Sequence, residues 1–85
     1  MAESDLLRKR LYFQSAHRGT KENDIILTRF ASARLGGMDD AQMRLYDRFL
    51  NELDPDIYHW LVRGGDDYPD EYKTLIADIR GAMNT

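Results

Sequence analysis

The chain has 85 residues, of which 42% are hydrophobic and 32% charged, and its formal net charge is −3. A chain this short has one small core and no room for an enzyme that encloses a large substrate, so we expect a single domain over residues 1–85. It has no cysteine, which excludes disulfides, thiolate zinc sites and cysteine nucleophiles. No apolar run reaches the roughly 18 to 20 residues that span a bilayer. The first five residues include two acidic side chains and no basic one, whereas a targeting peptide is basic at its start. We therefore expect no membrane insertion and a cytoplasmic protein.

Charge is unevenly distributed along the chain. Residues 1–21 contain five basic and two acidic side chains, a net +3, so the remainder carries −6. All five basic residues lie between Arg8 and Lys21, with no acidic residue among them. The sequence predicts an electrical dipole with a basic N-terminal end.

The first two predicted helices cover about residues 4–16 and 20–35, since apolar residues recur there with a 3.6-residue period. Glycine readily adopts the left-handed conformation that closes a helix, so Gly19 is expected to end the first and residues 36–37 the second. The wide apolar stripe of the second predicts a central, well-buried helix. The apolar residues are Leu6, Leu7, Leu11 and Phe13 in the first segment and Ile26, Leu27, Phe30, Ala31, Ala33 and Leu35 in the second.

The third predicted helix has the clearest start signal. Asp39 followed by Gln42 resembles a capping box, so the helix should begin near Asp40. We expect this helix to end before Asp54, which should cap the next helix, and Pro55, which should be the first residue of that next helix. Its apolar positions are Met43, Leu45, Tyr46, Phe49, Leu50 and Leu53.

Two further helices are predicted after Pro55. A short one ends at the glycines at positions 64–65, and Pro69 opens the last, which extends to about Met83. Trp60 in the short helix is expected to close one end of the core with its polar edge at the surface. No segment alternates as a strand would. The fold class expected is all-α, a compact bundle of about five short helices.

Catalytic signatures are missing from the sequence. It has no nucleophile elbow, no Gly-rich phosphate loop and no His pair spaced to bind a metal. Its adjacent carboxylates lie at predicted helix starts, where capping and the helix dipole explain them. We therefore expect that the protein is not an enzyme and binds no metal.

The junction of the first two helices holds the densest group of chemically useful residues. One interpretation is structural: Gly19 ends a helix, Thr20 caps the next, and Arg18 and Glu22 form an exposed ion pair. The other is a docking surface, in which arginine offers a planar fork of donors, glutamate an acceptor, and Gly19 lets a partner approach the backbone.

Two other functions remain open on the sequence. The basic stretch could contact nucleic acid, although the acidity of the whole chain and the aromatic residues within the stretch argue against it. A flavin or other planar ligand could stack on Trp60, although no convergent polar groups surround that residue in the sequence.

An ordered series of motifs resembles the small bacterial and mitochondrial flavinylation factors, the SdhE family. The series comprises residues 10–15 (Arg-Leu-Tyr-Phe-Gln-Ser), the signature Arg18-Gly19-x-x-Glu22, residues 23–27 (Asn-Asp-Ile-Ile-Leu), Phe30-Ala31, residues 45–50 (Leu-Tyr-Asp-Arg-Phe-Leu) and residues 54–61. It covers about two-thirds of the chain in order. The family commonly has a basic residue where this chain has His17, and the segment after Leu61 matches only loosely.

The resemblance implies a five-helix assembly factor that binds the flavoprotein subunit of succinate dehydrogenase, and in bacteria fumarate reductase, and promotes covalent attachment of FAD to that subunit. It implies a bacterial cytoplasmic or mitochondrial matrix location, no FAD held stably by the factor itself, no nucleic acid, and a monomer when free. An antitoxin-like regulatory role is the alternative, since some relatives carry that label. The partner-binding residues implied are Arg18, Gly19 and Glu22, with His17, Lys21, Arg10 and Asp24 as additional candidates.

Overall fold

The computed structural model describes residues 3–83 and contains the five helices in the expected order. They are α1 (Glu3–Ala16), α2 (Lys21–Arg34), α3 (Asp40–Leu50), α4 (Asp54–Leu61) and α5 (Lys73–Met83), with two 3-10 turns, η1 (Leu35–Gly37) and η2 (Asp70–Tyr72). No strand occurs between residues 3 and 83. The radius of gyration is 12.0 Å, close to the value of about 12 Å for a compact chain of this length. The all-α bundle is confirmed.

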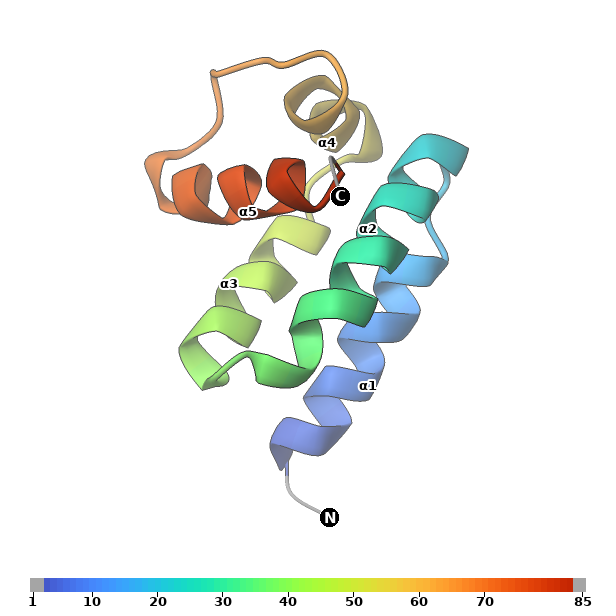
Figure 1. Ribbon diagram of the computed structural model, residues 1–85, viewed down its shortest axis with the longest axis vertical. Helices are drawn as coiled ribbons and strands as arrows, with labels where there is room; N and C mark the ends of the chain where they lie inside the picture. Colours follow the sequence, from blue (N-terminus) through green and yellow to red (C-terminus); the bar gives the residue numbers. More distant parts are fainter. Residues whose placement is uncertain (1–2, 84–85) are drawn as a thin grey trace.

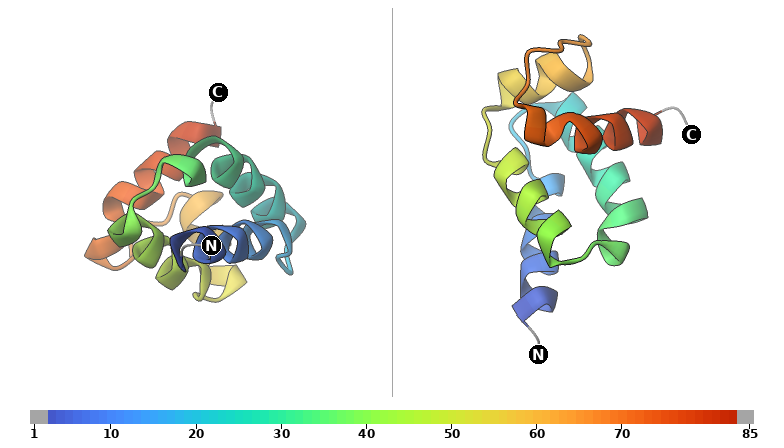
Figure 2. Two further views of the ribbon diagram at one scale, coloured as in Figure 1. Left: turned by 90° about the horizontal axis from the view of Figure 1, so that it is seen from below. Right: turned by 90° about the vertical axis from the view of Figure 1, so that its left-hand side faces the viewer.

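The helices form two parts that share one core. α1 packs against both α2 and α3, and these three helices run along the long axis of the molecule (Figure 1). α4 and α5 occupy the end away from the N-terminus, where both contact α2 (Figure 2). Within residues 3–83, no helix is both long and apolar enough to cross a bilayer. The junction between α1 and α2 lies at the same end of the molecule as α4, so residues of α4 lie beside it.

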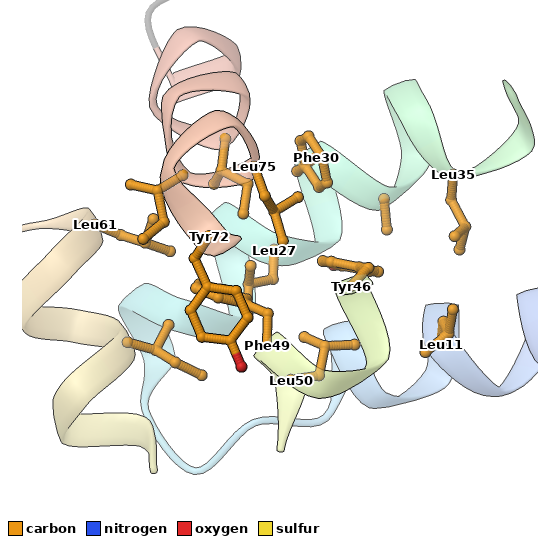
Figure 3. Packing of buried hydrophobic residues seen from close by; sticks show 14 of the residues in the cluster. Leu11, Leu27, Phe30, Leu35, Tyr46, Phe49, Leu50, Leu61, Tyr72 and Leu75 are labelled. Carbon is orange, nitrogen blue, oxygen red and sulfur yellow. The ribbon is translucent and has the colours of Figure 1, made fainter. Parts of the chain in front are cut away.

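Aromatic rings from three elements, α3, α4 and η2, pack together in the core. The Phe49 ring lies 5.3 Å from that of Tyr72, edge to face, and 6.1 Å from that of Trp60. Phe49 and Tyr72 point toward each other between α3 and the start of α5 (Figure 3). Offset and edge-to-face ring pairs of this kind add stability beyond the area that they bury. The indole Nε1 of Trp60 donates to Asp67 at 3.2 Å, so its polar edge meets the surface segment as expected.

Local signals place several helix ends correctly. Asp39 Oδ1 accepts from the Gln42 amide at 2.8 Å, and Gln42 Oε1 accepts from the Asp39 amide at 2.9 Å, which completes the capping box before α3. Beyond α4, Gly64 has φ +75°, the left-handed conformation that glycine tolerates best. The predicted end of the fourth helix is thus confirmed.

Several local expectations are wrong. α3 ends at Leu50, and Leu53 is 70% exposed rather than part of its buried stripe. Asp54 is the first residue of α4, not its cap; the cap position is Leu53, which makes no side-chain capping bond. In α2 the buried apolar residues are Leu27, Phe30 and Ala31, whereas Ala33 is exposed.

The conformation of Gly19 also differs from the expectation. Gly64 is the one glycine with positive φ in the described chain, so Gly19 does not close α1 in a left-handed conformation. Backbone freedom therefore does not explain a glycine at this position. The reason must lie in what surrounds Gly19.

Candidate functional site

The turn between α1 and α2, residues 17–20, and the first two residues of α2, Lys21 and Glu22, together form what we call the elbow. Thr20 precedes α2 in an extended conformation, with φ −109° and ψ 129°, and its side chain makes no capping bond. Its carbonyl oxygen accepts from the Asp24 amide at 2.9 Å. The side chain of Thr20 thus leaves the first amides of α2 uncapped, and the elbow takes its support from elsewhere in the fold.

Asp54 supplies that support from α4. Its Oδ1 accepts from Arg18 Nε at 3.0 Å and from Arg18 Nη2 at 2.8 Å. Its Oδ2 accepts from the backbone amide of Gly19 at 3.0 Å. One carboxylate therefore binds both the guanidinium and the main chain of the elbow, and we call these three hydrogen bonds the Asp54 clamp.

Asn23 extends the clamp to the first turn of α2. This side chain is completely buried, and its Nδ2 donates to the backbone carbonyl of Asp54 at 3.0 Å. Its Oδ1 is buried without a hydrogen-bond partner among residues 3–83. The start of α4 is thus fastened to the elbow and to α2, which fits the contacts between α2 and α4.

The clamp is largely shielded from water. The side chains of Arg18 and Asp54 are 12% and 24% exposed. Desolvation opposes ionisation of Asp54, but the hydrogen bonds from Arg18 and from the Gly19 amide outweigh it, and the pKa of this carboxyl is lowered. Hydrogen bonds between charged groups in such a setting are stronger than those of an exposed ion pair.

The lowered pKa predicts how stability depends on pH. A carboxyl with a pKa below its unfolded value of about 3.9 contributes stability that is fully present above that value and lost as pH falls through the folded pKa. We expect Asp54→Asn to lose less unfolding free energy than the wild type between about pH 5 and pH 2, as measured by urea denaturation. Asp66→Asn, at an exposed aspartate, should follow the wild-type curve. Identical curves for wild type and Asp54→Asn would contradict the clamp.

The expected pair between Arg18 and Glu22 is wrong, because Arg18 binds Asp54. Glu22 and Lys21 are exposed, and neither side chain has a hydrogen bond or ion pair with any residue from 3 to 83. Gly19 is exposed beside them. The elbow thus has a buried side, formed by Arg18 and the clamp, and an outward side, formed by Gly19, Lys21 and Glu22.

The three remaining predicted site residues lie around this outward side in different ways. His17 is exposed and stacks on the ring of Phe13 at 4.0 Å between ring centroids. Arg10, on α1, is seven positions before His17 and is paired with Asp47 of α3 at 2.8 Å. Asp24 is half-buried and accepts from Thr28 at 3.2 Å. Of these, His17 continues the exposed surface of the elbow.

Sequence reasoning missed Asp54 and Asn23 as parts of the site. Asp54 looks like an ordinary cap beside a proline, and it is 36 positions from Arg18. Asn23 lies within the matched motif series but has no spacing pattern of its own. Contacts between residues so far apart in the sequence depend on the tertiary structure, and a single sequence carries no signal for them.

The chemical groups that the elbow exposes are suited to polar and charged contacts. Within the described part of the chain, no three His, Cys, Asp or Glu side chains come close enough together to hold a metal ion. The exposed groups of the elbow are a carboxylate, an ammonium group and an open backbone. The fold and the elbow thus define a small all-α protein with a charged, exposed turn that is hydrogen-bonded to Asp54.

Comparison with known proteins gives the family. The family model described as flavinator of succinate dehydrogenase matches residues 9–83. The chain therefore belongs to this family, which confirms the resemblance seen in the motifs.

The relatives carry one name. "Succinate dehydrogenase assembly factor 2, mitochondrial" of Dictyostelium discoideum is 36% identical over 79 residues, 93% of this chain and 55% of the relative. The proteins of the same name in Komagataella phaffii and Debaryomyces hansenii are 49% and 41% identical, over 69% and 81% of this chain and 31% and 50% of their own lengths. The chain thus spans about half or less of the relatives that it matches.

Proposed function

We propose that this chain is an assembly factor that binds the flavoprotein subunit of succinate dehydrogenase and promotes covalent attachment of FAD to it, without being an enzyme itself. The observation that carries the proposal is the elbow: a charged, exposed turn hydrogen-bonded to Asp54, in a chain that matches the flavinator family over residues 9–83. The names of the relatives, which are assembly factors of the same complex, support it.

Binding alone is enough for this role. If the client attaches its own flavin, a helper need only bind the competent conformation of the client more tightly than the others. A difference of about 3 kcal/mol in binding free energy shifts that population by more than about a hundredfold. A rigid surface turn can supply such a difference without a pocket for the flavin.

The client-facing surface in this proposal is the outward side of the elbow, with Gly19, Lys21, Glu22 and His17 exposed. Arg18 lies beneath it, and Arg10 and Asp24 flank it. The factor holds no FAD of its own, so the purified protein should be colourless in an absorbance scan. The factor acts where its client folds, in a bacterial cytoplasm or a mitochondrial matrix, and fumarate reductase is a second client to be compared in the same assay.

Glu22→Gln should lower the rate of flavinylation at limiting factor by about tenfold, because it removes an exposed charge that is free to pair with a client cation. The fold should be unaffected, since the Glu22 side chain is exposed and has no hydrogen bond or ion pair with residues 3–83. The measurement is in-gel fluorescence of covalent flavin, with purified apo-subunit and FAD. Asp40→Asn is the matched control, because Asp40 begins α3 at the other end of the molecule (Figure 1). If the wild-type protein does not raise covalent flavin above the level without it, the proposed function is wrong.

A further inference from the structure

The carboxylate of Asp54, on α4, binds two neighbouring groups of the elbow, the guanidinium of Arg18 and the amide of Gly19. A guanidinium on a long side chain has many rotamers, and fixing it costs conformational entropy. Here two of its nitrogens bind the same carboxylate oxygen, at 3.0 and 2.8 Å, and the other oxygen binds the next amide at 3.0 Å. Arg18 and Gly19 are thus fixed together, and neither can move without breaking a charge-assisted bond.

The same contacts turn the donors of Arg18 away from solvent. Its side chain is only 12% exposed, whereas Gly19 and Glu22 are exposed. A docking arginine would offer its fork to the partner. In this fold Nε and Nη2 of the fork already donate to Asp54 Oδ1 of the same chain.

We infer that Asp54 is a positioning residue, which acts with Arg18 to hold the elbow so that Gly19 and Glu22 meet the client, and that Arg18 contributes through Asp54 rather than by contacting the client. This inference deepens the proposed function and depends on it. It gives Asp54, on α4, a role in docking at a surface that belongs to α1 and α2.

Pre-organisation explains why such a clamp would matter. The apparent affinity of a surface is reduced by the fraction of time that it spends in the binding shape. If loss of the clamp leaves the elbow in that shape about a tenth of the time, the Kd for the client rises about tenfold. The maximal rate at saturating factor stays unchanged, because the bound complex is the same.

The first experiment examines the clamp in the isolated protein. The Gly19 amide should exchange slowly with deuterated water in the wild type and quickly in Asp54→Asn and Arg18→Ala, as followed by NMR. Arg48→Ala is the control, since it breaks another ion pair, with Glu71 at 3.1 Å, in which both side chains are half exposed. An equally fast Gly19 amide in the wild type would overturn the inference whatever the function is.

The second experiment is a double-mutant cycle on binding to the purified apo-flavoprotein subunit and on flavinylation. Arg18→Ala and Asp54→Ala should each raise the Kd about tenfold, the double variant should be no worse than either, and the flavinylation rate should recover at saturating factor. If Arg18 contacts the client instead, Arg18→Ala will cost more than Asp54→Ala and the two losses will add.

The two experiments separate the inference from the proposed function. An additive cycle, or a maximal rate that stays low at saturation, overturns the positioning role while the assembly role stands. If the wild type neither binds the subunit nor raises its covalent flavin, the proposed function fails, and the docking role of Asp54 fails with it even if the Gly19 amide is protected.

Discussion

Phe49→Ala is expected to lower the unfolding free energy by about 3 to 5 kcal/mol, the range for truncating a fully buried aromatic ring. Phe49 is completely buried, and it meets the rings of Trp60 and Tyr72 from α4 and η2. Its loss leaves a cavity where three elements join, and a small domain has only about 5 to 15 kcal/mol of stability in total. Urea unfolding followed by circular dichroism measures the change, and a melting temperature lower by more than about 12 °C should accompany it.

Phe13→Ala is the matched control for Phe49→Ala, because the substitution is the same and Phe13 is 61% exposed. A surface substitution of this kind changes stability by about 0.5 kcal/mol or less. If the two variants lost equal stability, the orientation of α1 or of α3 in the bundle would be wrong. Phe49→Leu, which keeps most of the volume, should lose much less than Phe49→Ala.

The pair of phenylalanines also shows what the sequence could predict and what it could not. The 3.6-residue period predicts five helices because each one buries a single face, and the period is a local property. The same period counts Leu6 and Phe13 among the apolar residues of the first helix, yet both are more than half exposed. Periodicity identifies a helix, but which of two apolar faces is covered depends on where its neighbours lie.

Polar contacts also divide into those that the sequence predicts and those that depend on the tertiary structure. The capping box of Asp39 and Gln42 involves residues three apart and was predictable. So was the polar edge of Trp60, for which any surface partner serves. The partner of Arg18 was not predictable, because local spacing offers Glu22 while the fold brings Asp54 closer. The motif drew attention to the elbow, but the tertiary structure decides which of its residues face outward.

The requirement for glycine at position 19 follows from space. Its φ is not positive, so other residues can adopt its backbone conformation. A Cβ at this position would lie 3.1 Å from Asp54 Oδ2, so the carboxylate of the clamp would have to shift by a few tenths of an ångström. The close approach that needs glycine is thus that of Asp54 Oδ2, and on the proposed function a side chain here would disturb the clamp and cover main chain that the client approaches.

Gly19→Leu should therefore reduce flavinylation at least about tenfold, while the unfolding free energy falls by about 1 kcal/mol or less. Gly19→Ala should be intermediate in activity. Gly64→Ala is a control in which stability should change and activity should not. A Cβ there meets nothing within 4 Å, but φ is +75°, so the unfolding free energy should fall by about 1 to 2 kcal/mol. Flavinylation should stay normal. Each variant is measured by urea unfolding and by in-gel flavin fluorescence. If Gly19→Leu has normal activity, the elbow is not part of the docking surface. If Gly19→Leu loses more stability than Gly64→Ala, glycine at position 19 is required for folding and not for docking.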